Sequence, residues 1–201
     1  MAKSPSSPGK IARTRHRLIH AIRQEVCATG DFSAERVSLR AGVSPATFYN
    51  HFATKDEALV AAYQALMTDL DDMVTDRCRI EVLLDDGLRE FMSKWLLNTA
   101  SFFSTHAPLF RLAQAGIARS KELRNVFRQH QDFAIQAYAR LIELGQAAQA
   151  IRVGDSLILA QVLVVNTQGW FHPLIQKLKP NTGLHIEMVE TLVRMLRPDE
   201  H

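Results

Sequence analysis

The 201-residue sequence is poor in the residues that mark several classes of protein. Its two cysteines, Cys27 and Cys78, have no close spacing partner, so neither a disulfide framework nor a zinc site is expected. The first residues lack the apolar core of a secretory signal, and the longest apolar run, residues 157–165, is too short to cross a bilayer. With 9 Gly, 7 Pro and little β-branched alternation, the chain favours long helices over strands. We therefore expect an all-α, cytoplasmic protein.

Positive charge is gathered in the first quarter of the chain. Residues 1–55 carry 9 Lys and Arg against 3 Asp and Glu, whereas residues 56–201 carry 15 against 18. Such a basic segment is typical of a domain that meets a polyanion, although a solvated basic tail would have the same composition. Charge alone therefore leaves nucleic acid and a plain basic surface equally open.

Helix signals in this quarter predict a helix-turn-helix. An amphipathic helix begins at Ile11, and a second, short helix is capped by Ser33. Gly42 stops the second helix and allows a tight reversal, after which Ser44 caps a third helix over residues 45–51. Two short helices joined by a turn with glycine are the layout of a helix-turn-helix.

The third helix has one apolar face and one polar face. Phe48 and Phe52 share the apolar face and Pro45 lies near it, whereas Ala46, Asn50 and His51 point away from it and Thr47 and Tyr49 lie to either side. An outer face with short hydrogen-bonding groups suits the base edges and phosphates of a DNA major groove. For any single residue, an ordinary surface position remains the alternative.

These residues together resemble the N-terminal DNA-binding domain of the TetR family of bacterial transcriptional repressors. The resemblance covers residues 11–59 and rests on Gly30, Ser33, Ala41-Gly42-Val43-Ser44, Thr47-Phe48-Tyr49, His51-Phe52 and Lys55. It implies phosphate contacts by Thr47, Tyr49, His51 and Lys55, and base contacts by Pro45, Ala46 and Asn50. The predicted DNA-binding residues are Ser33, Ser44, Pro45, Ala46, Thr47, Tyr49, Asn50, His51 and Lys55. Phe32, Val37-Ser38 and Ala46 depart from the family's usual residues.

The domain organisation expected from these patterns has three parts. Residues 1–10 are Ser/Pro-rich and predict a disordered basic tail, and residues 11–55 form the helix-turn-helix domain. Residues 56–201 form a larger helical domain for ligand binding and dimerisation. A T-x-x-E capping box at Thr54 opens its first helix. Further helices are predicted over residues 83–104, 108–118, 120–146, 155–178 and 184–196.

The last two predicted helices indicate a homodimer. Residues 155–178 are apolar nearly all round, and residues 184–196 carry an apolar stripe. A second copy pairing through residues 155–196 would cover both, as the resemblance also implies, although one chain could cover both helices itself.

An effector pocket is expected only from the resemblance. Its candidate lining residues are Trp95, Phe102, Phe103, Phe110, Phe127, Phe133, Tyr138, Asn166 and Trp170. The few charges among them favour an apolar or aromatic ligand, and a plain aromatic core is the alternative.

No catalytic motif, cofactor motif or metal spacing is present in the sequence. His16 and His20 are spaced four apart on the basic helix, where DNA-facing or solvated histidines are favoured over a metal site. Together with the resemblance, the sequence predicts a non-enzymatic regulator of double-stranded DNA, a repressor released from a pseudo-palindromic operator by a small apolar ligand. A helical enzyme or small-molecule carrier with an incidental basic domain is the alternative.

Overall fold

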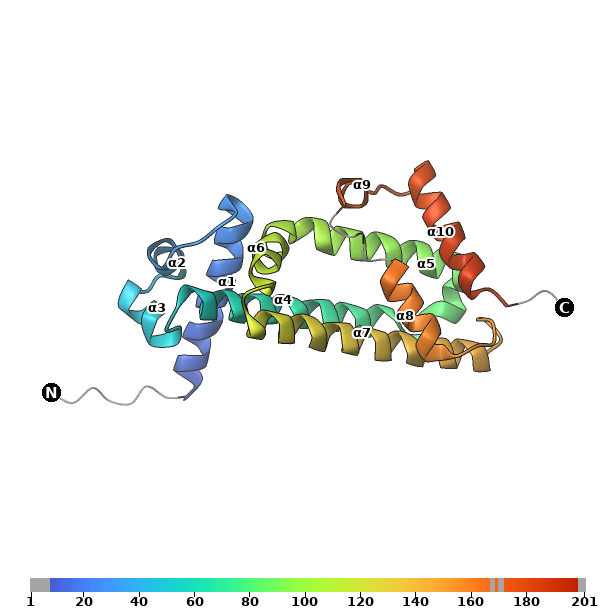
Figure 1. The fold of residues 1–201 in the computed structure, drawn as a ribbon, viewed down its shortest axis with the longest axis horizontal. Helices are drawn as coiled ribbons and strands as arrows, with labels where there is room; N and C mark the ends of the chain where they lie inside the picture. Colours follow the sequence, from blue (N-terminus) through green and yellow to red (C-terminus); the bar gives the residue numbers. More distant parts are fainter. Residues whose placement is uncertain (1–7, 167–168, 170–171, 199–201) are drawn as a thin grey trace. The chain divides into compact units, whose positions relative to one another are not determined.

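A computed structural model of the chain describes residues 8–166, 169 and 172–198. Its regular elements over these residues are all helices (Figure 1). They are α1 (Pro8–Thr29), α2 (Ala34–Ala41), α3 (Pro45–His51), α4 (Lys55–Arg77), α5 (Ile80–Thr105), α6 (Ala107–Ile117), α7 (Lys121–Ala147), α8 (Ser156–Asn166), α9 (Pro173–Gln176) and α10 (Gly183–Leu196). The all-α prediction is confirmed, and none of the described helices has the length and apolar character needed to cross a membrane.

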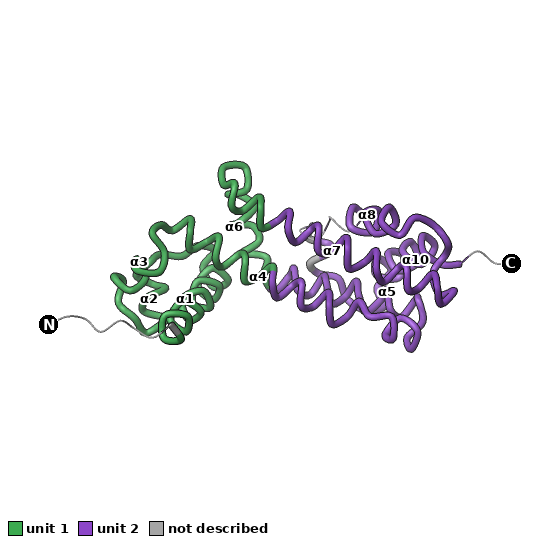
Figure 2. The backbone as a smooth tube through the Cα atoms, turned by 90° about the horizontal axis from the view of Figure 1, so that it is seen from below, with its two compact units in different colours: residues 1–67, 106–126 green, residues 68–105, 127–201 purple. Residues whose placement is uncertain are grey.

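The chain divides into two compact units (Figure 2). Unit 1 comprises residues 1–67 and 106–126, and unit 2 comprises residues 68–105 and 127–201. The helices α4 and α7 therefore contribute residues to both units.

The core of unit 1 is formed where α1 packs against α2 and α6, and where α2 packs against α3. Its fully buried side chains include Leu18, Ile22, Val26, Phe32, Val37, Phe48, Phe52 and Leu66. The first helix ends at Gly30, as predicted, because this residue adopts a left-handed φ of 81°. The helix begins at Pro8 rather than Ile11, so residues 8–10 of the expected disordered tail are helical, and residues 1–7 lie outside the described residues.

The predicted capping box at the start of α4 is present. The Glu57 backbone N–H donates to Thr54 Oγ1 at 3.0 Å, and Glu57 Oε2 accepts from the Ala53 backbone N–H at 2.7 Å. The first contact satisfies a backbone N–H that the helix start leaves without an intrahelical partner, and the second holds the residue before Thr54 against the first turn.

Unit 2 is built around α5, against which α9 and α10 pack. Gly87 interrupts α5 with a φ of 74° and a ψ of 158°, a break that the sequence analysis did not foresee. The buried His185 of α10 bonds Ser93 Oγ of α5 through Nε2 at 3.2 Å. Elsewhere in the unit, His130 Nδ1 of α7 lies 2.5 Å from Asp71 Oδ1 of α4.

The prediction of one helix over residues 155–178 is wrong. The helix α8 ends at Asn166, and the separate short helix α9 begins at Pro173. A proline ring disfavours helical backbone at the residue before it, and His172 is extended with a ψ of 133°. The His172 backbone N–H instead closes a turn onto the Gly169 carbonyl at 2.8 Å.

Candidate DNA interface

The α2–turn–α3 segment is fixed by backbone and capping contacts. Gly42 adopts a left-handed φ of 64°, and its N–H donates to the Leu39 carbonyl at 3.1 Å. The Val43 N–H donates to the Ser38 carbonyl at 2.9 Å, which closes the end of α2. Residue 42 therefore requires the left-handed backbone that glycine adopts without steric cost.

The starts of both short helices are capped by serine. Ser33 Oγ accepts from the Arg36 N–H at 3.3 Å, and Ser44 Oγ accepts from the Thr47 N–H at 3.2 Å. Ser44 Oγ also lies 2.9 Å from Thr47 Oγ1. Ser33, Ser44 and Thr47 thus hold the helix starts in place, whatever contacts they make with a ligand.

The two faces of α3 are as the sequence indicates. Phe48 and Phe52 are buried, with ring centroids 5.4 Å apart. Pro45, Ala46 and Asn50 are exposed, and His51 is half-buried. Tyr49 is 56% exposed, and its ring meets that of Phe48 edge-on with the centroids 5.4 Å apart. The helix offers a polar outer surface on a fixed apolar base.

Polar side chains of α1 also hold the α2–turn–α3 segment in place. Glu25 is buried, and its carboxylate pairs with Arg36 Nε at 2.8 Å and Arg40 Nη2 at 2.8 Å, both from α2. Arg17 donates to the Ala41 carbonyl at the end of α2. The Arg15 guanidinium lies 4.8 Å from the centroid of the Phe52 ring. The basic residues of α1 therefore stabilise the helix-turn-helix as well as adding positive charge beside it.

Lys55 does not extend freely into solvent. Its Nζ lies 2.8 Å and 3.0 Å from the two carboxylate oxygens of Asp31, in the loop between α1 and α2. It also lies 5.1 Å from the centroid of the Phe32 ring. Unit 1 thus contains all nine predicted DNA-binding residues, but one of them is paired with a carboxylate.

Sequence analysis missed Asp31, Glu25 and the structural roles of Arg15 and Arg17. Lys55 and Asp31 are 24 residues apart, so no helical or strand spacing relates them. The only sequence signal for the buried ion pair of Glu25 is that an acidic residue occurs on an otherwise basic helix.

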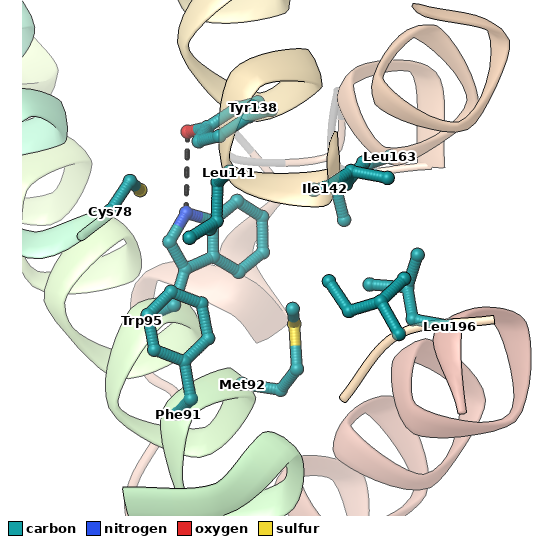
Figure 3. Close-up of a pocket in the computed structure, with 10 residues that line it drawn as sticks. Cys78, Phe91, Met92, Trp95, Tyr138, Leu141, Ile142, Leu163 and Leu196 are labelled. Atoms are coloured by element: carbon teal, nitrogen blue, oxygen red, sulfur yellow. Dashed lines mark hydrogen bonds between the residues drawn. The ribbon is translucent and has the colours of Figure 1, made fainter. Parts of the chain in front are cut away.

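A second candidate site is a cavity inside unit 2 (Figure 3). It is lined by Cys78, Phe91, Met92, Trp95, Tyr138, Leu141, Ile142, Ile151, Leu163 and Leu196. Trp95 Nε1–H donates to the Tyr138 hydroxyl at 3.2 Å across the cavity, with the two rings edge-on at 5.8 Å. Burial raises the pKa of the Tyr138 hydroxyl and raises the pKa of the Cys78 thiol to about 12, so both groups are neutral.

The enclosed space of this cavity is about 10 Å³, which is at the lower limit for one water molecule. Of the nine predicted effector residues, Trp95 and Tyr138 line it. Phe110 lies in unit 1 against Tyr63, and Phe133 is exposed. Asn166 is exposed and donates to the Val162 carbonyl of its own helix. Phe102, Phe103 and Phe127 are not among the lining residues, and Trp170 lies outside the described residues.

The helix α8 has one buried and one exposed apolar face. Leu159, Ala160 and Leu163 are buried within unit 2. The exposed face carries Leu157, Ile158, Val162 and Val165, and α10 adds exposed Leu184 and Ile186. Unit 2 by itself therefore leaves apolar helix surface in contact with solvent.

Solved structures of similar shape are transcriptional regulators. A protein of Mesorhizobium loti, described as a TetR-family transcriptional regulator, superposes with a TM-score of 0.76 at 17% identity, over 94% of this chain and 98% of that one. The chain has the TetR-family fold. A TetR transcription regulator of Haloarcula marismortui gives a TM-score of 0.70 at 15% identity, over 92% of this chain and 100% of that one.

A third similar structure is the flavonoid-responsive regulator FrrA, with a TM-score of 0.62 at 20% identity over 94% of this chain and 100% of that one. No protein-family model and no curated protein matches the sequence. The TetR-family likeness therefore rests on the fold and on the helix-turn-helix residues.

Proposed function

We propose that the protein is a transcriptional regulator that binds double-stranded DNA through the α2–turn–α3 segment. The observation that carries the proposal is the exposed polar face of α3, held on buried Phe48 and Phe52 by a glycine turn and two serine caps. Exposed Tyr49 and Asn50 offer a hydroxyl and an amide, groups that bind phosphates and base edges. The surplus of basic residues in residues 1–55 supplies the long-range attraction to DNA.

Selection of DNA from a random-sequence duplex library tests this function. We expect the protein to enrich a pseudo-palindrome, and we expect the logarithm of its affinity to fall linearly with the logarithm of salt concentration. Tyr49→Phe should weaken binding by about three- to tenfold through loss of one hydroxyl contact, with an unchanged circular dichroism spectrum. A library without any enriched sequence, or binding that salt does not weaken, would contradict the function.

The proposed regulator is a homodimer that pairs through α8 and α10. Exposed Ile158, Val162 and Val165 lie along one side of α8, and exposed Ile186 lies on α10. Removing such side chains from water favours association. A twofold dimer would carry two copies of α3, which matches a pseudo-palindromic site with half-sites one helical turn apart.

Sedimentation at micromolar concentration tests the dimer. Ile158→Arg should convert the protein into monomers, because it would bury an unpaired charge in the interface. Val153→Arg is the matched control, since Val153 is 88% exposed and lies outside α8 and α10. A wild-type monomer, or equal effects of the two variants, would argue against this interface.

The proposed effector is a neutral, largely apolar molecule that carries one hydrogen-bond acceptor. The cavity lining of unit 2 is apolar apart from the Trp95–Tyr138 pair and the neutral Cys78 thiol. The Tyr138 hydroxyl accepts from Trp95, and as a donor it could offer its own hydrogen to a ligand carbonyl or ether. FrrA, which shares the fold, is described as responsive to flavonoids, which are aromatic.

Effector binding would act by shifting a population. The cavity holds about 10 Å³, so a ligand must select or induce a more open arrangement of side chains such as Met92 and Leu196. If that arrangement binds DNA more weakly, the ligand lowers DNA affinity by its own preference for the open state. A repressor that behaves in this way would leave its DNA site when the ligand binds.

Probes of matched size test the chemistry of the effector. The neutral ketone acetophenone should raise the melting temperature and weaken DNA binding, while benzoate, which is of similar size, should do neither, because burying its charge is costly. Tyr138→Phe should reduce the response to the ketone. Binding of these probes with no effect on DNA affinity would favour a small-molecule carrier instead.

A further inference from the structure

The loop between α1 and α2 places a carboxylate against a residue expected to bind phosphate. Asp31 presents both carboxylate oxygens to Lys55 Nζ, at 2.8 Å and 3.0 Å. The backbone carbonyl of Asp31 is itself fixed, since it accepts from Thr29 Oγ1 at 2.6 Å and from Arg36 Nη2 at 3.3 Å. The backbone of Asp31 is therefore held by the loop, which places its carboxylate within reach of Lys55.

We propose that Asp31 is an internal competitor for the Lys55 ammonium group and thereby limits the affinity for DNA. The inference rests on the proposed DNA-binding function. A phosphate and a carboxylate carry the same sign of charge and seek the same N–H donors. A phosphate that approaches Lys55 must displace Asp31 or tolerate its charge nearby, and both lower the net gain from the contact.

Asp31 is not needed to hold Lys55 in place. The ammonium group also lies 5.1 Å from the centroid of the Phe32 ring, which is buried and fixed in the core of unit 1. Lys55 opens α4, whose start is held by the Thr54 and Glu57 capping box. Removing the Asp31 charge therefore leaves the ammonium group near its present position but without an anionic partner.

The pair is suited to exchange with DNA. The side chains of Lys55 and Asp31 are 53% and 55% exposed, and exposed ion pairs of this kind contribute little net stability. The hydrogen bond from Lys55 and that from the Phe32 backbone N–H lower the pKa of Asp31, so its carboxylate is charged at neutral pH. The Asp31 carboxylate is thus charged at the neutral pH at which DNA binding is measured, and a phosphate can displace it from Lys55.

Substitution of Asp31 in the full-length protein tests the proposal, with the duplex enriched by the wild-type protein as the probe. Asp31→Asn should tighten binding by about three- to tenfold at low salt. Asp56→Asn is the matched control, because Asp56 is exposed in the first turn of α4 beside Lys55 and its substitution removes the same charge. The control should change affinity by less than about twofold.

A double-mutant cycle with Lys55→Gln separates competition from a general charge effect. Asp31→Asn should tighten binding much less when Lys55 is absent, because the gain depends on the released ammonium group. Asp31→Ser provides a second variant if the first one disturbs the fold, as judged by circular dichroism. Weaker or unchanged binding by the Asp31 variants would overturn the proposal, as would equal effects of Asp31→Asn in the two Lys55 backgrounds. Failure of the wild-type protein to bind any duplex would instead overturn the proposed function.

Discussion

The helix-turn-helix segment and the cavity of unit 2 are held together by different kinds of contact. In the first, Ser33 and Gly42 cap the two ends of α2. The buried Glu25 carboxylate of α1 pairs with two arginines of α2 and so fixes α2 relative to α1. In the second, a hydrogen bond joins Trp95 and Tyr138 within a lining that consists mostly of apolar side chains. Hydrogen bonds are directional and specify one backbone position, whereas apolar contacts tolerate repacking. The contrast suits a rigid surface for DNA and a deformable interior for a ligand.

Among the substitutions that test this comparison, the largest loss of stability is expected from truncating a buried phenylalanine beneath α3. Phe52→Ala should reduce the free energy of unfolding by about 3–5 kcal/mol, because Phe52 is fully buried against Phe48. Hydrogen exchange should accelerate in residues 8–52 and change little in unit 2. Circular dichroism during urea unfolding measures the total loss.

The control for Phe52→Ala is Phe133→Ala. Phe133 is 38% exposed in unit 2, so the same substitution removes much less buried surface. If both variants lost equal stability, or if exchange in unit 2 accelerated as much as in unit 1, the burial argument for α3 would not hold.

A smaller effect is expected from the hydrogen bond in the cavity. Tyr138→Phe should reduce the free energy of unfolding by about 1 kcal/mol, because it removes the acceptor for Trp95 Nε1–H while keeping the ring. Tryptophan fluorescence should report a changed environment for Trp95. A loss above about 3 kcal/mol would indicate that the pair is a structural element rather than an adaptable part of the cavity.

The two regions also differ in how much of them the sequence predicted. Caps and turns are local, so Ser33, Gly42 and Ser44 could be recognised from neighbouring residues alone. The end of α8 was missed because an apolar run gave no local stop signal at Asn166. The Lys55–Asp31 pair was missed because only the folded chain brings these residues together. The cavity could not be assembled from periodicity either, since its lining comes from several helices of unit 2.

Ser38 offers a test of hydrogen bonding within the helix-turn-helix segment. Its hydroxyl is buried and has no hydrogen-bond partner within the described part of the chain. Ser38→Ala should therefore increase the free energy of unfolding by about 1 kcal/mol, since it removes an unsatisfied polar group and favours the helix. DNA affinity should stay the same, because Ser38 faces the core.

The matched control for Ser38→Ala is Ser33→Ala, which removes a hydroxyl that caps α2 and should lower stability by about 1 kcal/mol. Thermal unfolding of both variants gives the two signs directly. A destabilised Ser38→Ala variant would mean that the hydroxyl is satisfied in solution.

The smallest expected effect is the pH dependence of the Asp31–Lys55 pair. Because the pKa of Asp31 in the folded protein lies below its ordinary value of 3.8, ionised Asp31 stabilises the fold above that value, and the contribution is lost as pH falls through the folded pKa. Exposure to solvent limits it to less than about 1 kcal/mol. The difference in free energy of unfolding between wild type and Asp31→Asn should be constant near neutral pH and shrink below about pH 4. Carbon-13 NMR of the Asp31 carboxyl follows the same titration, and a midpoint above 3.8 would show that the pair does not persist in solution.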